Sequence, residues 1–271
     1  MEHLKVTLSI TSPDECDILI ALLSGIGYDG FEEEEGHLLA YIAQTAFSED
    51  ELAEVTTSRG ITYTTELIAA QNWNALWESN FEPVVVDGFC TIRAHFHDME
   101  IATPYDIMIT PKMSFGTGHH ATTQLMMQFM KDIDLKDKTV LDFGTGTGVL
   151  AILAEMLGAA DILAIDNDEW SVINTLENIE RNSCNKITVM QGSLEIADDF
   201  QPGIILANIN RHILLQYMPM LYAKLATQGT LLMSGLLTDD REIIMEAALE
   251  AGFKYNGLRE QANWIALIME K

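Results

Sequence analysis

The glycine-rich segment at residues 140–152, VLDFGTGTGVLAI, constrains the fold of this chain more than any other feature. It indicates a short apolar strand, a turn with glycines at 144, 146 and 148, and the start of a helix with a buried face. Glycines in such a turn let the backbone at a helix N-terminus approach a ligand closely. We therefore expect an α/β domain with a ligand site at this turn. The alternative is a glycine-rich turn that binds nothing.

The spacing of these glycines separates two kinds of cofactor. A dinucleotide-binding turn has the pattern G-x-G-x-x-G, and its third glycine would fall where this chain has Val149. The observed G-x-G-x-G, after a strand with an acidic residue near its end, resembles the first motif of S-adenosylmethionine-dependent methyltransferases. An oxidoreductase that uses NAD is therefore disfavoured.

A second acidic residue stands at the end of the next expected strand. Asp166 ends the apolar run 161–166 and lies 22 residues after Gly144. A carboxylate at this position can accept hydrogen bonds from both hydroxyls of a ribose. Asp168 is suited to cap the helix that begins near Trp170. NAD-binding proteins also carry an acid here, so Asp166 supports a nucleoside ligand without choosing the cofactor.

The composition is typical of a globular protein in a reducing compartment. The 271 residues are 48% hydrophobic, yet no apolar run approaches the roughly 20 residues that span a membrane. The first residues lack the apolar stretch of a signal peptide, and the three cysteines form neither a disulfide framework nor a metal-binding cluster. We expect a cytoplasmic protein with no membrane contact.

The charge of the chain is strongly acidic. The chain has 41 Asp and Glu residues and 15 Lys and Arg residues, which gives a net charge of −26. Because no basic patch offsets this charge, we expect no direct binding of nucleic acid, and a basic protein is the more natural partner. Residues 1–80 hold 15 acids, including the run 32–35, and only Lys5 and Arg59 as bases. This acidity serves either the docking of a partner or solubility alone.

The first 67 residues have the pattern of a small α+β domain. Helices are expected to open at Ser12 and Ser48, and the expected strands lie at 4–10, 28–33, 37–43 and 61–67. The order βαββαβ is that of a ferredoxin-like fold, which carries no chemistry by itself. We interpret residues 1–67 as a recognition domain and 68–80 as a helical linker, in which Trp73 and Trp77 share one face.

The loop at residues 111–123, PKMSFGTGHHATT, is the most specific motif. Its two adjacent histidines lack a third ligand at a suitable spacing, so we expect no metal. We interpret the loop as a lid over the cofactor, with Thr117, Thr122 and Thr123 as hydrogen-bond donors and Phe115 over an apolar part of the ligand. Alternatively, Thr122 or Thr123 simply caps the following helix.

Asn208 is the candidate catalytic residue. The apolar run 203–207 delivers it to the carboxyl end of a strand, where open α/β sheets place their ligand crevice. Many amino-methyltransferases have an Asn or Asp followed by two prolines there, whereas this chain has Asn-Ile-Asn. The Asn208 amide can still accept a hydrogen bond from an attacking amine or contact the methionine part of a cofactor. Asn210 is the better candidate for a helix cap.

The lid, the glycine turn, Asp166 and the sequence Ala-Ile flanking Asn208 together resemble the bacterial methyltransferases of large-subunit ribosomal protein eleven. The resemblance covers nearly the whole chain. It implies S-adenosyl-L-methionine as cofactor and an α/β fold. A Rossmann-like seven-stranded class I methyltransferase domain at residues 81–271 would follow the ferredoxin-like domain along the chain. The positions that match the family's cofactor contacts, or lie beside them, are Thr123, Gly144, Asp166 and Asn208, with Thr117, Gly146 and Ser193 as additional contacts.

The remaining chain suits this fold. We expect a hairpin at 84–92 with an Asp-Gly turn, a strand at 229–234, a helix at 238–251 and a final antiparallel strand pair at 253–259 and 264–269. Trp264 is expected in or beside the core.

The resemblance also implies a reaction, the transfer of methyl groups to lysine side chains and the N-terminal α-amine of the basic ribosomal protein, docked by the N-terminal domain. Aligning the amine with the methyl–sulfur axis should supply most of the rate gain. No residue suggests itself as a base, so we hypothesise that solvent takes the amine proton. The alternatives are a methyltransferase of another protein or a small molecule, and a module that binds S-adenosylmethionine without turnover.

Overall fold

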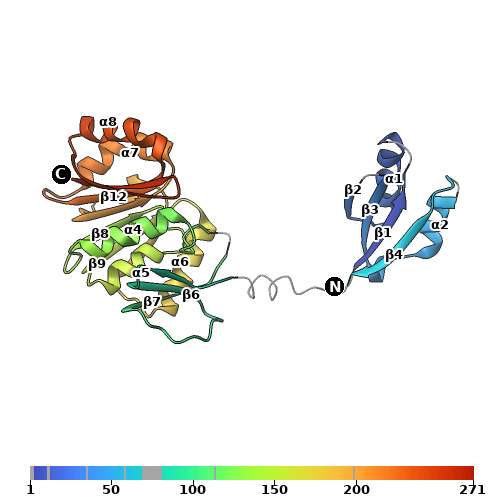
Figure 1. The fold of residues 1–271 in the computed structure, drawn as a ribbon, viewed down its shortest axis with the longest axis horizontal. Coiled ribbons are helices and arrows are strands. Elements are labelled where there is room, and N and C mark those ends of the chain that lie inside the picture. Colours follow the sequence, from blue (N-terminus) through green and yellow to red (C-terminus); the bar gives the residue numbers. More distant parts are fainter. Residues whose placement is uncertain are drawn as a thin grey trace. The chain divides into compact units, whose positions relative to one another are not determined.

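The computed structural model describes residues 3–10, 13–34, 36–57, 59–68, 81–112, 114–197 and 199–271. The chain divides into two compact units, Met1–Asn80 and Phe81–Lys271 (Figure 1). Of the helix expected at 68–80, Ile68 belongs to a strand instead, and the rest, with Trp73 and Trp77, lies outside the described residues, as does the expected cap Ser12. In the described part of the chain, no helix has the length and apolar character needed to cross a membrane.

The first unit has the βαββαβ order that the sequence predicts. Its elements are β1 (His3–Ser9), α1 (Pro13–Gly25), β2 (Gly30–Glu34), β3 (His37–Ala43), a short 3-10 turn at Gln44–Ala46, α2 (Glu49–Thr57) and β4 (Tyr63–Ile68). The strands form an antiparallel sheet in the order β2-β3-β1-β4, as in a ferredoxin-like fold.

One face of this small sheet carries the hydrophobic core of the first unit. Leu8 and Leu38 of the sheet pack with Leu19 of α1 and Leu52 of α2. Ser48 accepts a hydrogen bond from the backbone N–H of Glu51 at 3.4 Å, as a helix cap does. The edge strand β2 carries three exposed glutamates, Glu32, Glu33 and Glu34.

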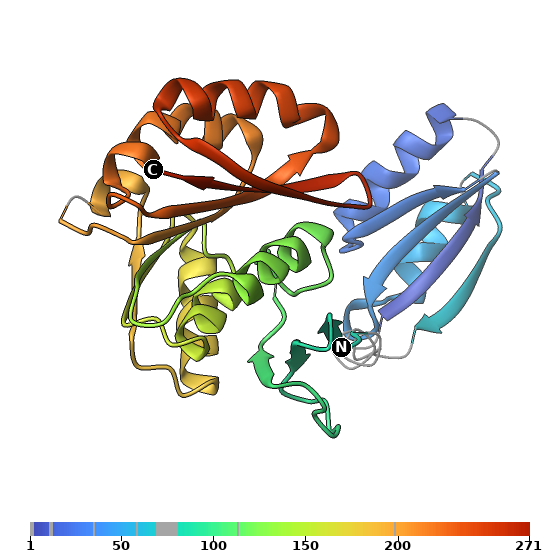
Figure 2. The ribbon, with the colours of Figure 1, turned by 60° about the vertical axis from the view of Figure 1, so that its left-hand side comes forward.

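The second unit is built on a seven-stranded sheet in the order β10-β9-β8-β11-β12-β14-β13. Its strands are β8 (Thr139–Phe143), β9 (Asp161–Asp166), β10 (Ile187–Gln191), β11 (Ile204–Asn208), β12 (Thr230–Leu237), β13 (Lys254–Gln261) and β14 (Trp264–Glu270). The first five strands in this order are parallel, and β14 pairs antiparallel with both β12 and β13. Figure 2 shows β13 and β14 as the long red hairpin, which confirms the expected final strand pair.

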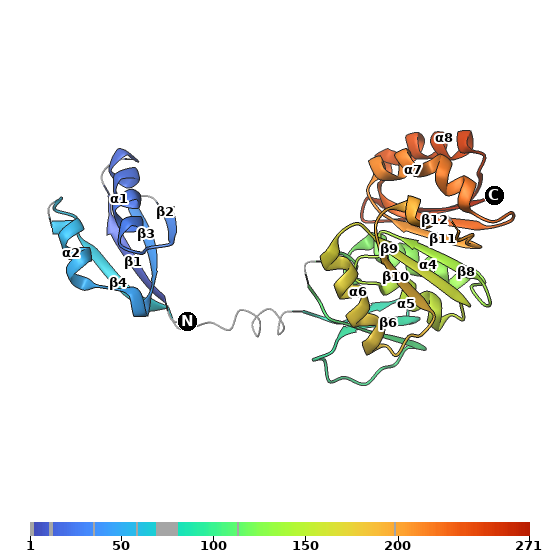
Figure 3. The same ribbon diagram turned by 180° about the vertical axis from the view of Figure 1, so that it is seen from behind.

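Helices cover both faces of this sheet. The helices are α4 (Ala121–Asp132), α5 (Val149–Met156), α6 (Glu169–Arg181), α7 (Arg211–Lys224) and α8 (Arg241–Ala251), and 3-10 turns lie at Leu194–Ala197 and Thr238–Asp240. Alternate residues of each strand face opposite cores, so that Val140 packs with α4 and α5 whereas Leu141 packs with α7 and α8. Figures 1 and 3 show these two helix layers on either side of the sheet.

A second, three-stranded sheet packs outside the helix layer of the second unit. It contains β5 (Val84–Val86), β6 (Cys90–Ala94) and β7 (Tyr105–Ile109), and β7 contacts α5 and α6. The expected hairpin between β5 and β6 is confirmed, and its turn residues Asp87 and Gly88 both have positive φ, 49° and 62°. The parallel pairing of β6 with β7 was not predicted from the sequence.

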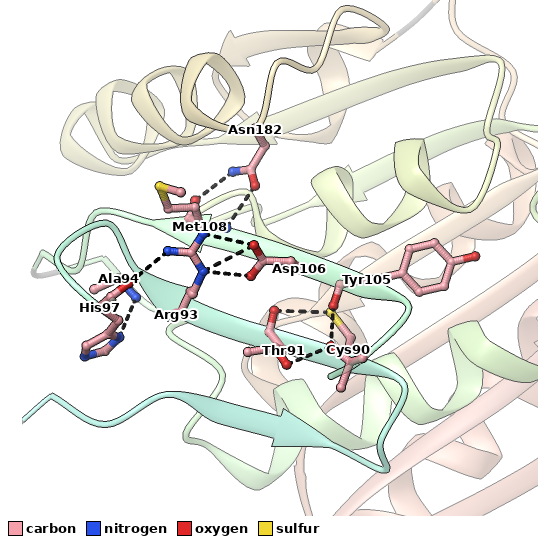
Figure 4. A network of polar contacts seen from close by, with 10 residues as sticks. Cys90, Thr91, Arg93, Ala94, His97, Tyr105, Asp106, Met108 and Asn182 are labelled. Atoms are coloured by element: carbon pink, nitrogen blue, oxygen red, sulfur yellow. Dashed lines mark hydrogen bonds and ion pairs between the residues drawn. The ribbon is translucent and has the colours of Figure 1, made fainter. Parts of the chain in front are cut away.

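A polar network ties this small sheet together and to α6 (Figure 4). The guanidinium of Arg93 on β6 donates to both carboxylate oxygens of Asp106 on β7, at 3.0 and 3.2 Å from Nε. Asn182, at the end of α6, bonds both backbone groups of Met108, at 2.9 and 2.6 Å. Arg93 Nη1 also donates to the carbonyl of His97, whose Nε2 lies 2.6 Å from the carbonyl of Phe81. The first residue of the second unit is thus held in place.

Candidate active site

A cavity of about 790 Å³ lies at the carboxyl ends of the parallel strands. Its walls come from the turn after β8, the end of β9, the turn after β10, the end of β11, the first turns of α7, the lid and the start of β14. Of the residues that the sequence singled out, the cavity is lined by Phe115, Thr122, Gly144, Gly146, Asp166, Ser193, Asn208, Asn210 and Trp264. The glycine turn, Asp166 and Asn208 meet there because the carboxyl ends of parallel strands share one edge.

The glycine turn needs its glycines for two reasons. Gly144 and Gly146 have φ of +78° and +59°, a conformation that other residues adopt only with strain. A Cβ atom on Gly146 would also overlap the carbonyl oxygen of Phe115 in the lid. Thr147 bonds the lid at the same place, through its N–H to the Phe115 carbonyl at 2.9 Å and its hydroxyl to the Gly116 carbonyl at 2.7 Å. Hydrogen bonds therefore hold the glycine turn and the lid together.

Asp166 ends β9, and both of its carboxylate oxygens are oriented by backbone groups. Oδ2 accepts from the Gly146 N–H at 2.9 Å, and Oδ1 accepts from the Asp168 N–H at 3.0 Å. A carboxylate has about four lone-pair sites, so it can accept two further bonds from a ribose diol. Asp168 is the N-cap of α6, as predicted, and its hydrogen bonds from Ser171 lower the pKa of its carboxyl group.

Asp142 lies behind the turn and does not line the cavity. Its Oδ2 accepts a hydrogen bond from the Thr145 hydroxyl at 2.7 Å, while its buried Oδ1 has no partner among the described residues. Burial raises the pKa of this carboxyl group to about 7, and the nearby charge of Asp166 acts in the same direction.

Asn208 ends β11 and is one of the residues that line the cavity. Its Nδ2 donates to the hydroxyl of Thr123 at 3.4 Å, which leaves the buried Oδ1 without a partner among the described residues. Thr123 is fully buried in the first turn of α4. A buried acceptor without a partner is uncommon in folded proteins, which makes Asn208 a candidate for contact with a ligand.

The residue that caps α4, the helix after the lid, differs from the one that the alternative interpretation of the sequence predicts. The N-cap of α4 is His120, whose side chain accepts from the Thr122 N–H, so neither Thr122 nor Thr123 is the cap. Thr122 lines the cavity, whereas Thr117 lies 3.2 Å from His119 Nδ1 and is not among the lining residues. Asn210 occupies the N-cap position of α7, but its side chain makes no capping hydrogen bond.

Two aromatic residues at the cavity were not predicted from the sequence. Tyr217 of α7 accepts a hydrogen bond from Ser193 at 2.9 Å, and its ring packs edge-on against Phe143 at 5.3 Å. Trp264, expected only in or beside the core, packs against the core and also lines the cavity. Nothing local in the sequence marks either residue, because their place depends on how α7 and the final hairpin pack.

The residues present fit S-adenosylmethionine. The cavity volume lies within the roughly 300–1,000 Å³ of small-molecule sites, and the lining includes the Asp166 carboxylate, two glycines, and Asn208, whose amide oxygen has no partner among the described residues. Among the described residues, no group of three or more His, Cys, Asp or Glu side chains is placed to hold a metal ion.

Solved structures of known methyltransferases share this fold. A ribosomal protein L11 methylase from Lactobacillus delbrueckii subsp. bulgaricus superposes with a TM-score of 0.65 at 30% identity, covering 70% of this chain and 98% of that one. A precorrin-6y C5,15-methyltransferase from Geobacter metallireducens shares the fold alone, with a TM-score of 0.52 at 13% identity, 60% of this chain and 93% of that one. The fold and the cavity define a class I methyltransferase, whose cofactor is S-adenosylmethionine.

Sequence comparison identifies the family within this class. The family model "Ribosomal protein L11 methyltransferase (PrmA)" matches residues 25–271. The proteins of that name from Porphyromonas gingivalis and Bacteroides thetaiotaomicron are 41% and 42% identical to this chain, over 98% and 93% of it and 97% and 92% of their own lengths. The chain belongs to the ribosomal protein L11 methyltransferase family.

Proposed function

We propose that this protein methylates amino groups of ribosomal protein L11, namely lysine side chains and the N-terminal α-amine. The observation that carries the chemistry is Asn208, a residue that lines the cavity and whose buried Oδ1 atom has no hydrogen-bond partner among the described residues. The observation that supports the substrate is the close similarity to proteins named for it.

The residues of this site have separate tasks. Bound S-adenosylmethionine supplies an electrophilic methyl group on its sulfonium sulfur. Asp166 accepts the ribose hydroxyls, and the backbone at Gly144 and Gly146 allows close approach of the cofactor. Asn208 Oδ1 accepts an N–H of the substrate amine and so aligns the nitrogen lone pair. Positioning of this kind can supply most of the rate gain for an in-line displacement.

The amine must be neutral before it reacts. An α-amino group has a pKa of about 8, and desolvation lowers the higher pKa of a lysine. The Nδ1 atom of His120 already accepts a hydrogen bond from the Thr122 N–H, and water is the proposed proton acceptor. His212 also lines the cavity, at the first turn of α7. Alanine variants at His120 and His212 test this step, since loss of turnover with intact cofactor binding in either variant would contradict it.

The acidic first unit is the proposed docking domain for the substrate. Its 15 acidic residues in positions 1–80 suit a basic ribosomal protein, because complementary charge raises the rate of encounter. Thr123, Thr117 and Ser193 are proposed as further cofactor contacts. The proposal places the protein in the cytoplasm, where ribosomal proteins are made.

Intact-mass spectrometry of purified L11 after incubation with the full chain and S-adenosylmethionine tests the function. We expect stepwise gains of methyl masses that disappear with Gly144→Arg, which fills the cofactor channel. If L11 gains no mass although calorimetry shows cofactor binding, the substrate is another protein or a small molecule. If no cofactor binds, the chemistry itself is wrong.

A further inference from the structure

Strand β10 forms one edge of the seven-stranded sheet, and it lacks the features that protect sheet edges from pairing with another chain. An edge strand presents unpaired backbone N–H and C=O groups. Natural proteins block such edges with charged side chains, prolines, bulges, short strands or a covering segment. The sequence of β10 is ITVMQ, which contains no charge and no proline, and its register against β9 has no shift.

The other edge strands of the described sheets are each protected. In the first unit, β2 carries three exposed glutamates and β4 carries Glu66. In the small sheet of the second unit, β5 has only three residues, and Asn182 covers the edge of β7 by bonding both backbone groups of Met108 (Figure 4). At the opposite edge of the large sheet, β13 contains charged residues and a register shift. β10 therefore stands apart as an open edge.

The backbone of β10 faces outward at every second residue. The Ile162 N–H of β9 donates to the Lys186 carbonyl, just before β10, at 2.9 Å. In a parallel pair, residues two apart bond the same neighbour, so the even-numbered residues of β10 face β9. Within the described part of the chain, nothing pairs with the outward N–H and C=O groups of the odd-numbered residues. These residues are Ile187, Val189 and Gln191.

One face of the sheet at β10 is covered by a short turn instead of a helix. The other connections between successive parallel strands of the sheet contain α5, α6 and α7, whereas β10 leads to β11 through the 3-10 turn Leu194–Ala197. A second cavity, of about 300 Å³, lies on this face over β9 and β10. Its apolar walls include Met190, Ile196 and Phe200, and the first two are 40% and 38% exposed.

The charges at this second cavity suit a basic side chain with an apolar stem. Among the described residues that line it, the charged ones are Asp161 and Asp199, and both are exposed. A lysine or arginine can bury its stem against the apolar walls and keep its charged end beside a carboxylate. On the other face of β10, Ile187 and Val189 are partly buried against the core. An apolar side chain beside them would extend that core.

We infer that β10 binds an extended polypeptide segment with alternating basic and apolar side chains, as an added strand of the sheet. Successive side chains of a strand point to opposite faces, so the basic ones meet the second cavity and the apolar ones meet the core. Main-chain hydrogen bonds supply affinity, and the cavity supplies selectivity. A second copy of β10 does not fit, because the strand has no basic residue.

This edge is separate from the active site, and the inference does not depend on the methylation of L11. The two cavities are lined from different ends of β9. Asp161, at the second cavity, begins the strand, whereas Asp166, at the active-site cavity, ends it.

Peptide binding tests the partner's chemistry. The full chain is titrated in a calorimeter with acetyl-Lys-Val-Lys-Val-Lys-Val-amide, and with the matched peptide that has Glu in place of each Lys. We expect the lysine peptide to bind at least about tenfold more tightly, because opposite charges on neighbouring strands attract and like charges repel. Equal affinities, or no binding of the lysine peptide, would overturn the inference.

Amide hydrogen exchange, measured by NMR, separates strand addition from a general attraction to an acidic protein. With the lysine peptide bound, we expect the outward N–H groups of Ile187, Val189 and Gln191 to gain protection. Those of Thr188 and Met190, which face β9, should change little. Binding of the peptide without this alternation would mean that it attaches by charge alone, and the inference would be wrong.

A charged side chain placed on β10 should block the added strand. Met190→Lys puts a positive charge on the wall of the second cavity, and Tyr255→Lys makes the same charge change on β13. Both positions are exposed, at 40% and 45%, so both variants should fold and keep their affinity for S-adenosylhomocysteine. We expect Met190→Lys to weaken binding of the lysine peptide at least about fivefold and Tyr255→Lys less than about twofold. Equal weakening would place the peptide elsewhere and contradict the inference.

Discussion

At the scale of single residues, Asn208, whose Oδ1 has no partner among the described residues, gives the sharpest prediction. We expect Asn208→Ala to lower kcat for L11 methylation by about 100-fold, because the amine loses the acceptor that aligns it. The matched control is Asn256→Ala, which removes an exposed amide bonded to Glu270 on the edge of the sheet. Steady-state kinetics with cofactor binding by calorimetry measure both. Equal effects of the two variants would show that Asn208 has no special role.

Asp142 gives a prediction about pH. Burial raises the pKa of its carboxyl group from 3.8 to about 7, so the folded protein binds this proton more tightly than the unfolded chain. The contribution of the group to stability is therefore full below about pH 4 and is lost as pH rises towards 7. Asp142→Asn keeps a neutral side chain at every pH.

Thermal unfolding from pH 4 to pH 9 measures this effect. The stability of Asp142→Asn relative to wild type should rise between pH 4 and pH 7, by up to about 4 kcal/mol at 1.36 kcal/mol per pKa unit, and stay constant above. Parallel stability curves for the two proteins would show that burial does not raise the pKa of Asp142 in the folded state.

At the scale of elements, two glycine variants separate two effects of adding a side chain. One effect is the clash between the glycine turn and the lid, and the other is the strain of a positive φ. Gly146→Ala forces a Cβ onto the Phe115 carbonyl at a φ of +59°. Gly88→Ala has nearly the same φ, +62°, in a turn with nothing within 4 Å of the added atom. We expect Gly88→Ala to destabilise the protein by about 1 kcal/mol and leave cofactor affinity intact.

Gly146→Ala should destabilise the protein more than Gly88→Ala does, and it should also displace the lid. We expect an additional loss of about 1–3 kcal/mol in stability and a cofactor affinity at least tenfold weaker. Denaturant unfolding and calorimetry give the two quantities. Similar results for the two variants would mean that the lid does not need the turn in this position.

The elements also show what the sequence could predict and what it could not. Strand-helix alternation, the glycine turn and the strand-end positions of Asp166 and Asn208 follow from local patterns, and the sheet brings them together as expected. The parallel pair β6–β7 escaped prediction because its connection, residues 95–104, contains no helix, unlike most parallel crossovers. Tyr217 and Trp264 were not predicted as cavity residues, because their place at the cavity depends on tertiary packing. The contacts proposed for Thr117, Thr123 and Ser193 remain predictions.

At the scale of the whole molecule, the distribution of charge predicts how substrate binding depends on salt. Positions 1–80 contain 15 acids and two bases, and Glu33 and Glu34 are exposed on edge strand β2. Raising ionic strength from about 0.05 to 0.5 M should increase KM for L11 several-fold and change kcat little, because screening acts on encounter.

Two double charge-reversal variants, one in each unit, test whether the first unit causes the effect of salt on KM. We expect the double variant Glu33→Lys, Glu34→Lys to raise KM several-fold at low salt. The double variant Glu246→Lys, Glu250→Lys makes the same charge change on exposed positions of α8 and should have a smaller effect. Equal KM values for the two double variants would point to net charge alone, without docking by the first unit.

The position of β14 has a consequence for how this protein is made. β14 is the last strand of the large sheet along the chain, yet it lies between β12 and β13 and begins with Trp264, which lines the cavity. During translation, the sheet therefore stays open until residues up to 270 have left the ribosomal exit tunnel. A nascent chain halted before Trp264 therefore lacks both an inner strand of the large sheet and a residue that lines the cavity.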